Sequence, residues 1–149
     1  MKKTLFGLLL LVSIVLTACG GAAPQNNTVS ATEVQTVITT SDTQGKAVSL
    51  DLKDGPVLFI AHWCPYCQQY LKQYEPEPNM KVVAVYPMDG ETEEQLREKA
   101  EALLEEAGWS GVPLYVAMDA DFLEGVPSIG YVNRHGTAEF VSAFEWHEL

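Results

Sequence analysis

An apolar run that leads directly into two closely spaced cysteines constrains the fold more than any other part of the chain. Residues 57–63 read VLFIAHW, a run of strand length that predicts a central strand buried on both faces. A helix is expected over residues 65–74, because Pro65 suits a first helical turn and apolar residues recur near one face. The sequence therefore places Cys64 where a buried strand ends and a helix begins.

The remaining segments alternate between strand and helix patterns. Two segments with β-branched residues, 34–40 and 46–52, flank a turn and predict a hairpin. An amphipathic helix is expected between Thr92, which forms a capping-box pattern with Gln95, and Gly108. Further strands are expected over residues 80–88, 114–118, 128–133 and 138–144. This order predicts an α/β fold with a mixed, mostly parallel central sheet, flanking helices and an N-terminal β-hairpin.

The first 18 residues have the pattern of a secretory signal peptide. Two lysines follow Met1, and an apolar run from Leu5 to Leu16 precedes small residues at a cleavage site. The sequence LTAC, which ends at Cys19, resembles the lipobox of bacterial lipoproteins. That resemblance implies that Cys19 is acylated and becomes the first residue of the mature chain. The alternative is an ordinary cleaved signal peptide that leaves Cys19 unmodified.

This pattern divides the chain into three parts. Residues 1–18 are the signal peptide, residues 19–32 form a lipid-anchored flexible tether, and residues 33–149 form one domain. The lipid would hold the domain at the extracytoplasmic face of the cell membrane. It is the expected means of membrane association, because Asp and Glu number 20 against 9 for Lys and Arg. The same acidic balance argues against nucleic acid as a partner.

Two cysteines separated by two residues can form a redox pair, carry a metal or make a static disulfide. A redox pair is favoured, because a helix N-terminus stabilises the thiolate of Cys64 and Cys67 lies one turn later, where it could resolve a mixed disulfide. Pro65 restricts the backbone, and Trp63 should provide an apolar surface beside the sulfur. A zinc site needs about four ligands, and the chain has no second cysteine pair. A static disulfide over so short a loop would stabilise the fold little.

The segment 48–71, VSLDLKDGPVLFIAHWCPYCQQYL, resembles the thioredoxin superfamily. The similarity is to the TlpA-like branch of membrane-tethered, extracytoplasmic thiol-disulfide oxidoreductases, and it extends from Gly45 to Phe144. The resemblance implies a thioredoxin-like fold in which Cys64 attacks and Cys67 resolves, with no metal or organic cofactor. It also implies two kinds of partner: thiols or disulfides of exported proteins, and a dithiol electron carrier in the membrane.

A cis-proline that faces the cysteines is the second mark of this family. Two Gly-Val-Pro segments could carry it, at 111–113 and 125–127. The later segment is chosen, because the residues after it match the strand, turn and strand of the family. The resemblance then implies that Pro127 is cis and that the backbone of Val126 pairs with an incoming substrate chain. Further substrate contacts are expected from Trp63, Pro65 and Tyr66.

Some features depart from the family. The dipeptide Pro65-Tyr66 is the one that glutaredoxins carry, which leaves the redox potential open. The helix before the cis-proline is shortened to ADFLEG, residues 120–125. His62 is expected to be a partly exposed residue at the strand end. A carboxylate that assists proton transfer cannot be assigned among Glu75, Asp89 and Glu91.

The direction of electron flow stays open at this point. The TlpA-like resemblance favours a reductase, but an oxidase that installs disulfides in exported proteins would use the same residues. A lipoprotein that carries a soft metal on the two thiolates is an alternative of another class. A domain of the same fold that only docks partners is a third possibility.

Overall fold

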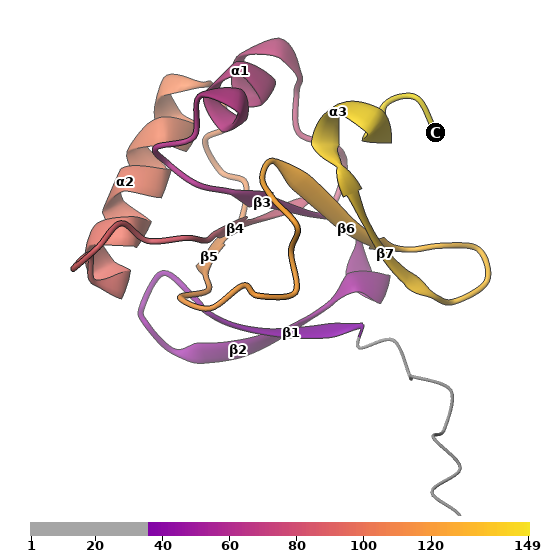
Figure 1. The fold of residues 1–149 in the computed structure, drawn as a ribbon, viewed down its shortest axis with the longest axis horizontal. Helices are drawn as coiled ribbons and strands as arrows, with labels where there is room; N and C mark the ends of the chain where they lie inside the picture. Colours follow the sequence, from indigo (N-terminus) through magenta and orange to yellow (C-terminus); the bar gives the residue numbers. More distant parts are fainter. Residues whose placement is uncertain (1–35) are drawn as a thin grey trace, which may run out of the picture. The chain divides into compact units, whose positions relative to one another are not determined.

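The computed structural model describes residues 36–149 (Figure 1). The predicted signal peptide, residues 1–18, and the tether, residues 19–32 with the lipidation site Cys19, lie outside the described residues. Thr36 lies one residue before the first strand, so each strand that the sequence predicts can be compared with the structure.

Seven strands form one sheet among the described residues. They are β1 (Val37–Ser41), β2 (Ala47–Asp51), β3 (Val57–Ile60), β4 (Lys81–Ala84), β5 (Leu114–Val116), β6 (Ser128–Val132) and β7 (Ala138–Ser142). Their order in the sheet is β2-β1-β5-β4-β3-β6-β7 (Figure 1). The β3–β4 and β4–β5 pairs are parallel, and the other four pairs are antiparallel. The α/β, thioredoxin-like fold class is confirmed, but the prediction of a mostly parallel sheet is wrong.

Connection length explains the mixed pairing. Tight turns join β1 to β2 and β6 to β7, and strands joined by a tight turn must run antiparallel. The two parallel pairs are the ones whose strands are joined through a helix. After β5 the chain passes through the loop 117–127 and returns as β6, which runs antiparallel to β3. Both flanks of the sheet are therefore antiparallel.

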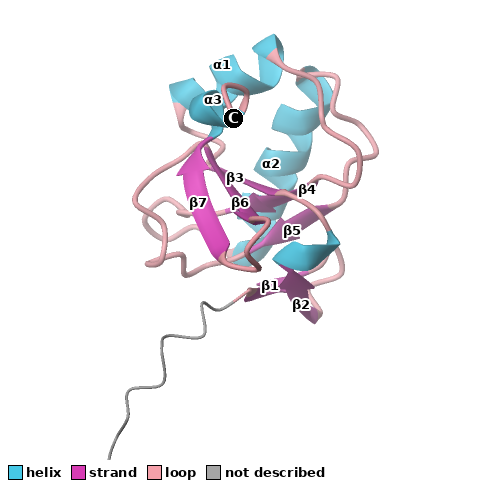
Figure 2. Ribbon diagram, turned by 90° about the vertical axis from the view of Figure 1, so that its right-hand side faces the viewer, coloured by secondary structure: helices cyan, strands magenta, loops and turns pink. Residues whose placement is uncertain are grey.

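The helices cover one face of the sheet only. They are α1 (Pro65–Gln73), α2 (Glu93–Glu106) and α3 (Ala143–Trp146), with a 3-10 turn η1 (Leu52–Asp54). All three α-helices lie on the same side of the strands in both views (Figures 1 and 2). On β3, Leu58 and Ile60 pack into the cluster that contains the residues of α1 and α2. Val57 and Phe59 pack on the other face, against the hairpin, η1 and the loop 117–127. The strand is buried on both faces as predicted, whereas helices flank the sheet on one side.

The predicted capping box begins α2. The Gln95 N–H donates to Thr92 Oγ1 at 3.3 Å, and the Thr92 N–H donates to Gln95 Oε1 at 3.0 Å. Two orphan amides of the first turn are satisfied in this way. The chain leaves the helix at Gly108, whose positive φ of +81° suits a residue without a side chain.

The sequence pattern does not predict α3. It favours one strand over residues 138–144, but β7 ends at Ser142 and a single helical turn follows. Long-range contacts hold this turn, which a pattern of apolar residues cannot reveal. The Ala143 N–H donates to the carbonyl of Pro127 at 3.0 Å, and the indole N–H of Trp146 donates to Glu77. The turn therefore fixes the C-terminus against the loop that precedes β6.

Candidate active site

Cys64 lies at the junction that the sequence predicts, between the end of β3 and the start of α1. It is the N-cap residue of α1, and its sulfur accepts a hydrogen bond from the Cys67 N–H at 3.4 Å. Pro65 occupies the first position of the helix, where a missing N–H costs nothing. The Cys64 sulfur therefore bonds to a backbone amide that has no partner within the helix, and the helix start is an environment that favours negative charge.

Cys67 lies one helical turn later and is more deeply buried. Cys67 is 0% exposed and Cys64 is 5% exposed, so an incoming group reaches Cys64 first. The Cys67 sulfur accepts a hydrogen bond from the Ala61 N–H at 3.5 Å. Burial raises the pKa of the Cys67 thiol far above its usual range, and the neighbouring Cys64 raises it further. Both residues are free thiols in this structure.

A cis peptide bond joins Val126 to Pro127, the proline that the sequence analysis selected. It is the only cis bond within residues 36–149, and Pro113 instead directly precedes β5. The Cys64 thiol donates to the Val126 carbonyl over 3.6 Å, so the loop before β6 lies directly against the outer sulfur. The structure therefore brings together three of the residues predicted for the site: Cys64, Val126 and Pro127.

A groove beside this loop contains another predicted residue. Tyr66 is exposed and lines a cavity of about 740 Å³ together with Val126, Pro127 and Phe144. Residues of β6 and β7, among them Ser128 and Val141, also line this cavity. An extended chain could lie in this groove next to the Cys64 sulfur.

Trp63 is held in place by a residue that the sequence analysis did not single out. Its indole N–H donates to the carbonyl of Tyr86 at 2.8 Å. Tyr86 has a left-handed backbone conformation, with φ of 53°, which costs a non-glycine residue about 1 kcal/mol. The Tyr86 hydroxyl donates to the carbonyls of Ala120 and Leu123, at 3.3 and 3.0 Å. These bonds connect the residue before Cys64 to the loop 117–127.

The buried side chain of Glu91 contacts His62 and Lys99. Its side chain is 3% exposed and lies 3.0 Å from His62 Nε2 and 2.7 Å from Lys99 Nζ. The Met88 N–H also donates to it at 2.9 Å. Burial by itself would raise the pKa of Glu91, but the bonds from Lys99, Met88 and His62 together lower this pKa to about 2.

These contacts of Glu91 position the strand end and do not supply a proton acceptor. A carboxylate with so low a pKa is a weak base, and the other two carboxylates considered from the sequence, Glu75 and Asp89, are exposed. His62 is partly exposed, as expected, and the amide of Gln68 donates to its carbonyl at 3.1 Å. Side-chain contacts thus hold the residue that precedes Trp63 from two directions.

We expect Glu91→Gln to lower the free energy of unfolding at pH 7 by about 1–3 kcal/mol, because hydrogen bonds of a charged group are lost. The lowered pKa of Glu91 means that its charge stabilises the fold above pH 4.5 and that this contribution disappears as the pH falls toward 2. The difference between wild type and variant should therefore shrink from pH 5 to pH 2 in urea titrations. Glu98→Gln, an exposed position on α2, is the matched control. A difference that does not change with pH would contradict this assignment.

Other kinds of site are not seen in the described part of the chain. Between Thr36 and Leu149, no three His, Cys, Asp or Glu residues group in a way that could hold a metal ion. Over the same range, none of the helices has the length and apolar character needed to span a membrane.

Comparisons with known proteins gave similarity to solved structures only. No protein-family model matches the chain. The search of curated proteins likewise gave no match. Among solved structures, StoA from Bacillus subtilis is 18% identical over 75% of this chain and 94% of its own, with a TM-score of 0.46.

Two further structures are similar at the same level. A thio-disulfide isomerase from Thermus thermophilus is 17% identical over 71% of this chain and 81% of its own, with a TM-score of 0.45. A secreted Mycobacterium tuberculosis disulfide oxidoreductase, homologous to E. coli DsbE, is 19% identical over 70% of this chain and 82% of its own, with a TM-score of 0.42. In this chain the cysteine pair at the start of α1 and the cis-proline beside it lie on a thioredoxin-like fold, as the resemblance of segment 48–71 implies.

Proposed function

We propose that this chain is a protein thiol-disulfide oxidoreductase that acts on exported proteins. One observation supports the proposal above the others: the outer sulfur, Cys64, lies 3.6 Å from the Val126 carbonyl at the edge of a groove, with Cys67 buried behind it. A substrate chain that pairs with the backbone at Val126 would present its disulfide to Cys64. Trp63, Pro65, Tyr66 and Pro127 shape the surface that it meets.

The proposed reaction proceeds in two exchange steps. In the first, Cys64 loses its proton to solvent, and its thiolate attacks one sulfur of the substrate disulfide. A mixed disulfide forms, and the other substrate sulfur leaves as a thiolate that takes up a proton. In the second step the Cys67 thiol loses its proton and attacks Cys64, and this releases the second substrate sulfur. Two electrons and two protons pass to the substrate, and the domain is left with a Cys64–Cys67 disulfide.

We favour the direction of a reductase. The resemblance of segment 48–71 to the TlpA-like branch supports this direction. The residues of the site do not distinguish the two directions, because a reductase and an oxidase use the same pair of thiols. A disulfide-forming oxidase that uses the same residues is the alternative.

The membrane attachment belongs to the same proposal. The lipobox-like sequence before Cys19 supports a lipid anchor that holds the domain on the extracytoplasmic side. In that compartment a membrane protein with its own dithiol would restore the reduced pair after each turnover. No resident metal or organic cofactor takes part in either exchange step.

The reduction potential of the pair tests the direction. We expect equilibration with glutathione to give a potential nearer to thioredoxin, about −270 mV, than to a strong oxidant at about −120 mV. The reduced full chain should also reduce insulin disulfides. A potential near the oxidant value would reverse the proposed direction. Tight binding of copper or zinc without any insulin reduction would instead indicate a metal carrier.

A further inference from the structure

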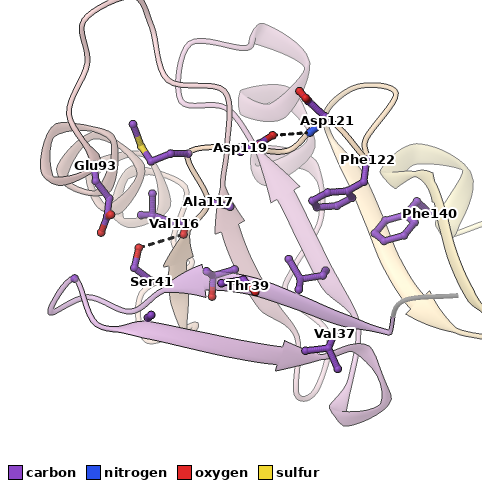
Figure 3. A pocket seen from close by; sticks show the side chains of 15 residues that line it. Val37, Thr39, Ser41, Glu93, Val116, Ala117, Asp119, Asp121, Phe122 and Phe140 are labelled. Atoms are coloured by element: carbon purple, nitrogen blue, oxygen red, sulfur yellow. Dashed lines mark hydrogen bonds between the residues drawn. The ribbon is translucent and has the colours of Figure 1, made fainter. Parts of the chain in front are cut away.

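The strand β1 separates from the sheet on the side away from β2. It pairs with β2 at five positions, from Val37 to Ser41, but with β5 at one position only, Ser41 opposite Val116. From Ser41 back toward Val37 the two strands diverge and leave an open wedge (Figure 3). Among residues 36–149, one long edge of β1 therefore lacks a neighbouring strand over most of its length.

The backbone of β1 presents hydrogen-bonding groups to this wedge. Two backbone hydrogen bonds lie at the ends of the β1–β2 ladder. At one end the Leu52 N–H donates to the Thr36 carbonyl, and at the other the Asp42 N–H donates to the Lys46 carbonyl. In an antiparallel ladder, alternate residues point their N–H and C=O groups toward the partner strand. Residues 36, 38, 40 and 42 therefore face β2. The N–H and C=O groups of Val37 and Thr39 face the wedge.

The wedge opens into a cavity of about 720 Å³ on the face of the sheet that lacks α-helices. Its walls are largely apolar, and three large apolar side chains are exposed on them: Val37, Met118 and Phe122. We call this cavity, between β1 and residues 116–122, the β1 cleft. Exposed strand groups beside apolar pockets are the features by which an extended peptide adds to a sheet.

The rim of the β1 cleft is acidic. Asp119 and Asp121 both line it, and neither forms a salt bridge with another residue of the described chain. The third acidic residue, Glu93, already pairs with Arg97. A bound chain that carries Lys or Arg would therefore complement the charge at Asp119 and Asp121, whereas an acidic chain would be repelled.

The β1 cleft adjoins the groove at the candidate active site. Phe122 and Phe140 line both cavities, and their ring centroids are 5.4 Å apart. Figure 3 shows the two rings side by side at one end of the cleft. Phe140 lies on β7 and reaches the groove that contains Val126 and Pro127. One extended chain could pass from the Cys64 sulfur across these rings into the wedge.

We propose that the β1 cleft binds an extended segment of the substrate polypeptide, in which apolar residues alternate with Lys or Arg. The inference rests on the proposed function, because it assumes that a disulfide in the same substrate reacts at Cys64. The segment pairs with the N–H and C=O groups of Val37 and Thr39, its apolar side chains enter the cleft, and its basic side chains meet Asp119 and Asp121. The substrate is thus an unfolded or locally extended protein.

The test uses the full chain and two peptide disulfides. The short peptide contains only a disulfide loop, and the tailed peptide adds an extension in which Val and Lys alternate. We expect the tail to lower KM by about tenfold and to leave kcat unchanged. A tail that alternates Val with Glu should give no such gain. The double variant Asp119→Lys with Asp121→Lys should reverse this preference.

A matched pair of proline variants tests the strand pairing. Thr39→Pro removes an N–H that faces the cleft, and Ser49→Pro removes one that faces away from β1 on the outer edge of β2, directly opposite Thr39. We expect Thr39→Pro to abolish the effect of the tail and Ser49→Pro to retain it. Both variants should reduce the short peptide normally, which shows that they fold.

Several outcomes would overturn the inference. One is an equal KM for the short and the tailed peptide. Another is that Thr39→Pro and Ser49→Pro lose the effect of the tail on KM to the same extent. Binding of the tail that appears only when residues 20–33 are deleted would show that the chain fills its own cleft. If the protein self-associates at rising concentration and the tailed peptide is then displaced, the cleft binds a second copy of the chain instead. If the short peptide is not reduced either, the proposed function fails, and anisotropy with a cysteine-free tail still tests the cleft.

Discussion

Replacing Cys64 by Ser should lower the turnover of protein disulfides by at least about a thousandfold, because the sulfur that begins the exchange is lost. Cys67→Ser should also stop turnover, but at a later step. Its outer sulfur can still attack a substrate, and the mixed disulfide then has no internal thiol to resolve it. The second variant should therefore accumulate a covalent complex with its substrate, whereas the first should not.

Insulin turbidity and non-reducing gels measure these two effects. Cys19→Ser is the control, because it removes the third cysteine of the chain and retains the pair. In detergent solution this control should turn over substrate like the wild type. Normal turnover by Cys64→Ser would contradict the assigned roles, and so would complexes formed equally by both variants of the pair.

We expect Trp109→Ala to have the largest effect on stability, a loss of about 3–5 kcal/mol in the free energy of unfolding. Trp109 is 2% exposed, and its indole N–H donates to the carbonyls of Leu71 and Tyr74, at 3.0 and 3.1 Å. These carbonyls lie at the C-terminus of α1, where helices have acceptors without an internal partner. The variant thus leaves a cavity and also frees the end of the helix that carries both cysteines.

Urea unfolding of Trp109→Ala and Trp63→Ala compares the free energies of unfolding of the two variants. Trp63 is the same residue type but is 49% exposed, so its replacement should cost less than about 1 kcal/mol. The free energy of unfolding of small domains is only about 5–15 kcal/mol, so the loss in Trp109→Ala should clearly lower the urea concentration at the midpoint of unfolding. Equal midpoints for the two variants would contradict the anchoring role of Trp109.

The local elements and the position of the cysteine pair could be predicted from sequence. The run 57–63 contains a strand whose neighbours bury it on both faces, and the pattern from Thr92 to Gly108 carries its own start and stop signals. Cys64 follows the first of these elements directly, so its place at a helix start needed only local information.

Features that depend on distant contacts could not be predicted. The turn α3 exists because Ala143 bonds to Pro127 and Trp146 to Glu77, residues far away in the sequence. Glu91 was considered among the carboxylates, but its bonds to His62 and Lys99 arise only when the loop after β4 folds over the strand end. The pairing of β1 with β5 at one position, and hence the β1 cleft, likewise follows from how strands diverge in space.

The most direct test of the proposed chemistry identifies which cysteine carries the substrate. Peptide mapping of the complex trapped by Cys67→Ser should find the substrate bonded to Cys64 and no other residue of the chain. In the wild type, mapping after a single turnover should find a Cys64–Cys67 disulfide, one for each substrate disulfide that was reduced. Substrate attached to Cys67 in the Cys64→Ser variant, or reduced substrate without any bond between the two cysteines, would contradict the account.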